Sequence, residues 1–184
     1  GTITVKAGNV CGFSTASSLT VTVAAPGQWI GITTNWNDGQ NWCSGILPGI
    51  STNVTIPSGT PNSPVISVAT AMAHNVSIAA GASLTVTGAK FQIGGAIANN
   101  GSFDVTNGTI EMNGSLIQNI PANIFVNDAL KNLIVSNSNA AGLTLNGRLD
   151  IYRSLGFGPA GLKLNTNGFL TLKSTAQETA WLED

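Results

Sequence analysis

The chain has 184 residues, of which only 8% are charged, and seven basic residues stand against eight acidic ones. Average soluble domains carry roughly 25% charged residues, and this sparse, balanced charge excludes the basic surface that nucleic-acid binding requires. Apolar residues make up 42% of the chain, which is typical of a folded protein and not of a disordered one. No apolar run approaches the roughly 18 residues of a spanning helix, so we expect no nucleic-acid partner and no membrane span.

The first part of the chain carries two strand patterns, TITVKA at residues 2–7 and LTVTV at residues 19–23. They predict a β-hairpin, to which we assign residues 1–25. Because an isolated hairpin is marginal in water, we expect it to pack against the segment that follows. The chain opens within a strand pattern and shows no signal peptide, which suggests a fragment of a longer protein.

A tryptophan-rich segment follows, and we assign residues 26–50 to it. It holds Trp29, Trp36 and Trp42. One interpretation is an aromatic platform for a sugar ring, with nearby polar residues supplying hydrogen bonds or a weak Ca²⁺ site. These polar residues are Asn35, Asn37, Asp38 and Gln40. The other interpretation is a cap that covers the open apolar end of a solenoid. A single carboxylate is a poor Ca²⁺ site, which favours the cap.

The segment from residue 51 to residue 184 predicts a solenoid. The motif NVTI at residues 53–56 recurs as NVSI at residues 75–78, with an insertion in the first coil. Three prolines mark this insertion, Pro57, Pro61 and Pro64, and such insertions form loops on one side of a repeat. His74, the sole histidine, has no acidic or Cys neighbour in sequence and is interpreted as a turn residue.

The region from Leu84 to Leu116 shows the repeat most regularly, with apolar and polar residues alternating in short triplets. Five apolar positions recur after nineteen residues. The pairs are Leu84 with Phe103, Val86 with Val105, Phe91 with Ile110, Ile93 with Met112, and Ile97 with Leu116. A fixed period of this length with about three short strands per coil predicts an all-β fold, a single-stranded parallel β-helix.

The nineteen-residue register then fails, since the column of Phe91 and Ile110 would continue into Ala129 and Arg148. We therefore predict a phase slip within residues 117–131, with a bulged coil or a helical turn. The strand pattern resumes at residues 143–145, 149–151, 162–164 and 170–172. Asn-Gly pairs mark the corners, where we expect positive φ. These pairs are Asn100-Gly101, Asn107-Gly108, Asn113-Gly114, Asn146-Gly147 and Asn167-Gly168. The tail loses the alternation, and Trp181 is expected to plug the last coil.

Over nearly its whole length the chain resembles the β-helical modules of large, adhesin-like, multi-repeat surface proteins of gliding, polysaccharide-degrading Gram-negative bacteria. Residues 1–23 are similar to the last two strands of an immunoglobulin-like or PKD-like repeat. The other carrying motifs are the tryptophans with their Asn and Gly neighbours at residues 29–42, NVTIPSG, NVSIAAG, NNGSFDVTNGTIEMNGS and GLKLNTNGFLTLKS. The resemblance implies an extracellular, surface-attached protein, but no active site to carry over.

No chemical site is evident in the pattern of titratable residues. In the nineteen-residue register Glu111 lies over Gln92 and Asp104 over Thr85, so no acid stacks on another, as a glycosidase or a Ca²⁺-dependent lyase would need. A stacked pair of Lys131 and Asp150 would only decorate a solvated face. Cys11 and Cys43 either form a disulfide after export or are two separate thiols.

We therefore expect a non-catalytic structural or adhesive module without cofactor or metal, exported to the cell surface. Its partners would be an extracellular polysaccharide or another surface protein, and adjoining domains of the same chain. One alternative is a glycan-binding module that uses exposed aromatic residues, and a remote alternative is a degenerate polysaccharide lyase. The candidate binding residues are Trp29, Trp36, Trp42, Asn37, Asp38 and Tyr152.

Overall fold

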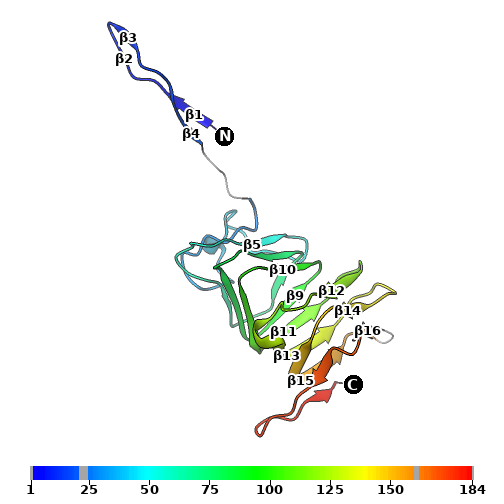
Figure 1. Ribbon diagram of the computed structural model, residues 1–184. Coiled ribbons are helices and arrows are strands. Elements are labelled where there is room, and N and C mark those ends of the chain that lie inside the picture. The colour runs from blue at the N-terminus through cyan, green and yellow to red at the C-terminus, as the bar shows by residue number, and fades with distance from the viewer. Residues whose placement is uncertain (1, 21–24, 160–161, 184) are drawn as a thin grey trace.

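The computed structural model describes residues 2–20, 25–159 and 162–183. A hairpin is followed by a parallel β-solenoid of about six turns, as Figure 1 shows, which confirms the all-β class and the predicted β-helix. Helix is limited, in the described ranges, to two 3₁₀ turns, η1 (Gly39–Asn41) and η2 (Val126–Asp128). The same ranges contain no helix with the length and apolar character needed to cross a membrane.

The predicted hairpin is present. Strand β1 (Thr2–Val5) pairs antiparallel with β4 (Ser17–Thr20), and β2 (Gly8–Asn9) pairs with β3 (Gly12–Phe13) near the tip. The predicted strand residues 21–23 lie outside the described residues. Ile3 and Val5 are 53% and 63% exposed, and the hairpin stands away from the solenoid in Figure 1. As far as residues 2–20 are described, the expected packing against the segment that follows is not seen.

Three parallel sheets form the sides of the solenoid. One three-stranded sheet has the order β10-β8-β5, another has the order β12-β14-β16, and the eight-stranded sheet runs β17-β15-β13-β11-β9-β6, with β7 on β9 and β18 on β15. The strands are β5 (Val54–Ile56), β6 (Val65–Ile66), β7 (Ala71–Ala73), β8 (Val76–Ile78), β9 (Ser83–Ile93), β10 (Ile97–Asn99), β11 (Ser102–Met112), β12 (Gln118–Ile120), β13 (Ala129–Val135), β14 (Leu143–Leu145), β15 (Leu149–Phe157), β16 (Leu164–Asn165), β17 (Leu170–Leu172) and β18 (Trp181–Leu182).

The core is a single column of apolar side chains inside the coils. Along β9 and β11 the first and third residues of each triplet point inward and the middle one points outward, so the alternation in sequence becomes alternation in side-chain direction. The inward residues of these two strands are Leu84, Val86, Phe91, Ile93, Phe103, Val105, Ile110 and Met112. Each contributes about 1.5–3 kcal/mol by leaving water, and this burial selects the register in which the coils stack.

The nineteen-residue register is confirmed where β9 and β11 pair. Phe103 lies beside Leu84, Ile110 beside Phe91 and Met112 beside Ile93. Other coils are longer: Val76 lies beside Val54, twenty-two residues earlier, and Leu143 beside Gln118, twenty-five residues earlier. The coil length therefore varies along the solenoid while the sheets remain parallel.

The phase slip predicted within residues 117–131 is confirmed. Strand β10 pairs with β8, and β12 pairs with β14, but β10 and β12 belong to different sheets. Between β12 and β13 the chain forms η2, with positive φ at Asn123, Asn127 and Asp128. The predicted pairing of Ile97 with Leu116 is wrong, because Ile97 lies beside Val76 and Leu116 is 71% exposed.

The glycines of the Asn-Gly corners serve two different purposes. At Asn167-Gly168 both residues have the expected positive φ, 49° and 79°. The other four Asn-Gly pairs do not, and there the glycine allows a neighbouring coil to approach closely. A Cβ on Gly108 would lie 2.6 Å from the carbonyl oxygen of Val86, which is closer than any ordinary contact.

The last coil has short strands and partly exposed apolar residues. Strand β17 continues the sheet beside β15, and β18 pairs with the second half of β15. Trp181 is 41% exposed, and the guanidinium of Arg153 lies 5.5 Å from its ring centre. The ring is therefore a surface group in contact with a cation and not the expected plug.

Candidate functional site

The three tryptophans of the candidate platform are buried. Trp29, Trp36 and Trp42 are 0%, 1% and 1% exposed, and Trp42 stands edge-on to the other two, with ring centres 5.0 and 4.6 Å apart. The indole N–H of Trp29 donates to the carbonyl of Asn62 (2.7 Å), and that of Trp42 donates to the carbonyl of Trp36 (2.9 Å). These rings present no face on which a sugar could stack.

The tryptophan segment is a rudimentary first coil as well as a cap. Gln28 forms a parallel bridge with Thr55, and Asn35 forms one with Val65, so the segment pairs with two faces of the next coil. The ring of Trp36 lies 5.0 Å from that of Phe91. From Phe91 the aromatic contacts continue through Phe103 to Phe125, which joins the cap to the middle of the solenoid.

The polar candidates beside the tryptophans are engaged in local structure. Asn37 Nδ2 donates to the carbonyl of Val68 (2.7 Å). Asp38 caps η1 by accepting from the N–H of Gln40 (2.9 Å). No group of three or more His, Cys, Asp or Glu residues that could hold a metal ion occurs in the described part of the chain. The geometry thus assigns Asn37 and Asp38 to folding the first coil.

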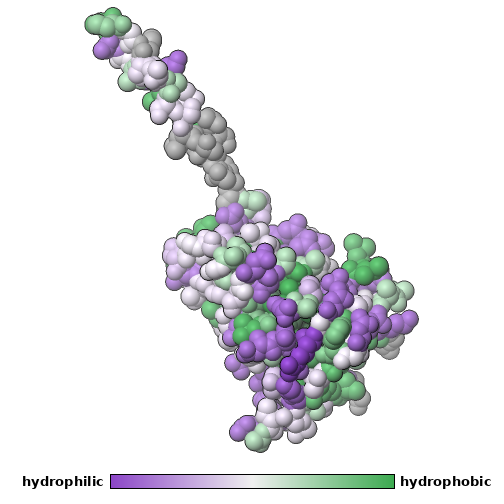
Figure 2. Space-filling view, in the orientation of Figure 1, coloured by the Kyte–Doolittle hydropathy of each residue, from purple (hydrophilic) through white to green (hydrophobic). Residues whose placement is uncertain are grey.

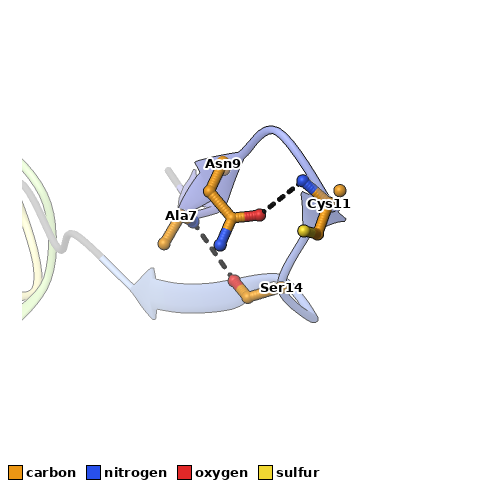
Figure 3. Close-up of a pocket in the computed structure, with 6 residues that line it drawn as sticks. Ala7, Asn9, Cys11 and Ser14 are labelled. Carbon is orange, nitrogen blue, oxygen red and sulfur yellow. Dashed lines mark hydrogen bonds between the residues drawn. The ribbon is translucent and has the colours of Figure 1, made fainter.

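The two cysteines lie in different parts of the fold. Cys43 belongs to the first coil, where its N–H donates to the carbonyl of Gln28 (3.0 Å). Cys11 lies at the tip of the hairpin, where its N–H donates to Asn9 Oδ1 (2.8 Å) and the N–H of Ala7 donates to Ser14 Oγ (3.1 Å), as Figure 3 shows. The shallow hollow at this tip is lined only by exposed residues, and the structure does not bring the two cysteines together.

Glu111 is the centre of a network on the outer side of β11. Its carboxylate accepts from Gln92 Nε2 (2.9 Å) and Ser136 Oγ (2.9 Å) and pairs with Lys90 Nζ (2.6 Å). Burial raises the pKa of Glu111, but the hydrogen bonds from Lys90, Gln92 and Ser136 outweigh it and leave the pKa below its ordinary value. Glu111 is therefore a carboxylate at neutral pH and not a proton donor.

Asp150 is a second buried carboxylate, 2% exposed, on the outer side of β15. Its Oδ2 lies 2.6 Å from both Arg148 Nη2 and Lys173 Nζ. Burial raises its pKa, but the hydrogen bonds from Arg148 and Lys173 lower it further, so the net shift is downward. Lys131, which the nineteen-residue register would have stacked on Asp150, pairs instead with Glu178 (3.2 Å).

Tyr152, the remaining candidate, is half-buried on β15, with Lys173 Nζ 5.8 Å from its ring centre. Figure 2 shows hydrophilic side chains gathered over β11, β13 and β15. The carboxylates in this region are tied to cations of neighbouring coils, as described for Glu111 and Asp150. The carboxylates and the cations of adjacent coils therefore neutralise each other's charge.

A groove that the sequence did not predict follows one corner of the solenoid. We call it the corner groove. It consists of two hollows of about 330 and 200 Å³, and both are lined by His74 and Gly94. The first hollow is completed by Ile50, Ser51 and residues 113–115, and the second by Asn75, Gly95, Ala96 and residues 116–119. Successive coils thus contribute to two adjacent hollows that share His74 and Gly94.

Backbone bonds fix the walls of the corner groove. The N–H of Asn113 donates to the carbonyl of Ile93 (3.1 Å), and that of Gly95 donates to the carbonyl of His74 (2.8 Å). Gln118 crosses the slip: its Oε1 accepts from the N–H of Gly114 (2.8 Å), and its Nε2 donates to the carbonyls of Ile93 (3.0 Å) and Gly95 (2.8 Å). One wall is therefore held by a side chain where the sheet is interrupted.

Asn113, which lines the first hollow, has a side-chain oxygen without a partner in the described part of the chain. Asn113 Oδ1 is buried and makes no hydrogen bond with any described residue. Leaving a buried acceptor unpaired costs about 1–3 kcal/mol, so the fold bears a cost at this position. A sequence signal for this site exists in the nineteen-residue repeat. Gly94 and Asn113 are nineteen residues apart, and each directly follows the end of a paired strand, β9 or β11.

The comparisons with known proteins give one match. The model of a family described as a domain of unknown function, DUF8693, matches residues 28–141, which is more than half of the chain. The matched region begins in the tryptophan-rich first coil and runs through both strands that flank the corner groove. No curated protein and no solved structure matches the chain. The chain therefore belongs to the DUF8693 family of domains of unknown function.

Proposed function

We propose that this chain is a non-catalytic structural or adhesive module of an exported cell-surface protein. The observation that carries the proposal is the way in which outward polar side chains are bonded to one another between coils. Such bonds tie each turn to the next, and the buried carboxylates Glu111 and Asp150 are held by cations. A solenoid stiffened in this way suits a spacer or a presenting surface.

The ladders of bonded side chains occur on more than one side of the solenoid. Asn75 Nδ2 donates to Asn53 Oδ1 (2.9 Å). On β13, Asn132 donates to Thr109 Oγ1 (3.0 Å) and accepts from Ser154 Oγ (2.9 Å), which links three successive coils. The network around Glu111 spans β9, β11 and the end of β13 in the same manner. Each of these hydrogen bonds between coils adds about 0.5–1.5 kcal/mol to the stability. Bonds of this kind occur at several coils along the axis.

The place of action and the partners are part of the same proposal. The resemblance to adhesin-like β-helical modules of gliding, polysaccharide-degrading bacteria supports an extracellular, surface-attached location. The partners would be an extracellular polysaccharide or another surface protein, together with adjoining domains. Antibody labelling of intact cells that produce the protein tests the location, and a signal that appears only after lysis would contradict it.

The absence of catalysis is tested on the purified chain. Incubation with neutral and uronic-acid polysaccharides should release neither reducing ends nor products with the absorbance of unsaturated sugars. Turnover of a uronic-acid polymer would instead favour the remote alternative, a degenerate polysaccharide lyase. The carboxylates that a lyase would need, Glu111 and Asp150, are each paired with cations in this fold.

Glycan binding through an aromatic platform is the second candidate that the sequence raised. The burial of Trp29, Trp36 and Trp42 leaves Tyr152 as the half-exposed ring of that set. One ring beside Lys173 is a small contact for a polysaccharide. The corner groove offers a better-formed surface for such a ligand.

A further inference from the structure

We propose that the corner groove binds a neutral, extended oligosaccharide along the axis of the solenoid. The inference deepens the adhesive form of the proposed function and rests on it, because it names the ligand class through which the module would attach. None of the six candidate residues from the sequence lines the groove, so the site is a new one.

The shape of the corner groove fits a linear polymer. Its residues come from equivalent corners of successive coils, with Ser51, His74, Gly94 and Asn113 each reached after one turn. Neighbouring parallel strands are about 4.8 Å apart, which is close to the advance of one sugar residue along an extended β-linked chain. A peptide strand repeats the same face only about every 6.7 Å, so it would fall out of step with the coils.

The absence of a side chain at Gly94 lets the side chains of two neighbouring coils close over it. Gly94 lines both hollows, and a Cβ there would lie 3.2 Å from Ile50 Cδ1 and 3.3 Å from His74 Nδ1. A larger side chain at this position would push Ile50 and His74 aside and change the shape of both hollows. The φ of Gly94 is not positive, so its lack of a side chain matters here more than its backbone freedom.

The polar lining suits hydroxyl groups. Asn113 Oδ1 is buried without a partner, and the amide oxygen and nitrogen can exchange places by a flip of the side chain. A hydroxyl both donates and accepts, so it satisfies the amide in either orientation. The imidazole of His74 and the hydroxyls of Ser51 and Ser115, which also line the first hollow, can both donate and accept.

The charge and the rim of the groove favour a neutral sugar over an acidic one. Its lining contains no Asp, Glu, Lys or Arg among the described residues. Leu116 and Ile117 stand exposed beside β12, where Figure 2 shows hydrophobic side chains, and Ile50 is partly exposed at the first hollow. These apolar groups can cover the C–H faces of a sugar, whereas a uronate would find no cation.

The test titrates the full chain, labelled with ¹⁵N, with neutral cello-, xylo- and manno-oligosaccharides and follows the amide signals by NMR. We expect shifts confined to residues of the corner groove, including the side-chain amide of Asn113. Asn113→Ala should weaken the binding about tenfold, and Gly94→Val should abolish it. The matched control, Asn146→Ala in an exposed corner outside the groove, should bind as the native chain does.

Thermal unfolding separates a binding role from a structural one. Asn113→Ala removes an unpaired buried acceptor, so its Tm should equal or exceed that of the native chain. A marked fall in Tm with unchanged binding would overturn the inference, because Asn113 would then serve the fold. The exposed rim variant Ile117→Ser gives a second check that should leave Tm unchanged and reduce affinity.

The remaining outcomes concern the ligand class. A folded chain that binds none of the neutral oligosaccharides overturns the inference, and so does preferential binding of oligogalacturonate or of an extended Ser/Thr-rich peptide. Surface labelling of intact cells is measured separately. The corner groove can therefore fail while the surface module stands, whereas loss of surface labelling would contradict the proposed function and leave the titration as a separate result on the groove.

Discussion

Replacing Trp36 with alanine should destabilise the protein by about 4–5 kcal/mol. Complete removal of a buried Trp or Phe side chain costs about 3–5 kcal/mol. Trp36 is 1% exposed, and its ring makes edge-on contacts with Trp42 at 4.6 Å and with Phe91 at 5.0 Å, which places it at the upper end. The carbonyl that accepts from the indole of Trp42 belongs to the backbone and survives the change.

The assay is urea unfolding followed by far-UV circular dichroism. With a slope of about 2.5 kcal/mol per molar urea, the midpoint should fall by about 1.5–2 M. The matched control is Trp181→Ala, which removes the same side chain from a site that is 41% exposed, and its midpoint should fall by less than half as much. Because solenoids can unfold in steps, the slope of each variant is compared with that of the native chain.

Equal midpoints for the native chain and Trp36→Ala would refute the cap interpretation. If such a variant also lost binding on a glycan array, the aromatic platform would be the better explanation of the tryptophan cluster. A fall in stability with retained glycan binding supports the cap and leaves the corner groove as the binding surface.

Three further perturbations test other parts of the fold. Lowering the pH from about 7 to about 3 should reduce the free energy of unfolding, because the folded pKa values of Glu111 and Asp150 are depressed. The stability that these two carboxylates contribute is present above their unfolded pKa values near 4 and is lost as the pH falls through the folded values. In urea titrations the double variant E111Q/D150N should show a flatter dependence of stability on pH. Gly108→Ala should cost about 1–3 kcal/mol by calorimetry, whereas Gly49→Ala, where a Cβ meets open space, should not destabilise; equal effects would contradict the close-approach argument. Gln118→Ala should cost about 2–3 kcal/mol and speed hydrogen exchange at the slip, and an unchanged exchange pattern would count against its bridging role.

The fold could be predicted because, along each strand of a parallel β-helix, buried apolar residues alternate with outward polar ones. At Leu84 and Phe103 each inward position had to be apolar, and the two coils have the same length. The pairing of Ile97 with Leu116 failed because residues were added to the next coil. A fixed period gives only the spacing along the chain. Once a corner contains additional residues, that period no longer identifies which residues lie side by side in adjacent coils.

The corner glycines show a second limit. Gly168 has a positive φ, whereas Gly108 admits the backbone of the coil below it. Both follow Asn and both look alike in sequence. The difference lies in how near the neighbouring coil runs, which is fixed by coil lengths that the sequence does not state.

The candidate site was less predictable than the fold. Tryptophans attract attention as sugar platforms, but their large apolar area also makes them good end covers, and the free energy of burial decided the outcome at Trp29 and Trp42. The corner groove depends on Gly94 and Asn113 being brought together with His74 by stacking. Neither Gly94 nor Asn113 carries a chemical signature of its own.

The interruption between β10 and β12 has a mechanical consequence. It divides one face into a block before the slip and a block after it, which stand apart in Figure 1, while the eight-stranded sheet runs through both. The chain of aromatic rings begins in the first block and ends at Phe125, just after β12, and the coils beyond it are filled by aliphatic residues and finish in short strands. Under load at the C-terminal end, the later coils would peel away first as one cooperative unit. The aromatic block would hold longer, so the module would lengthen in two steps rather than break at once.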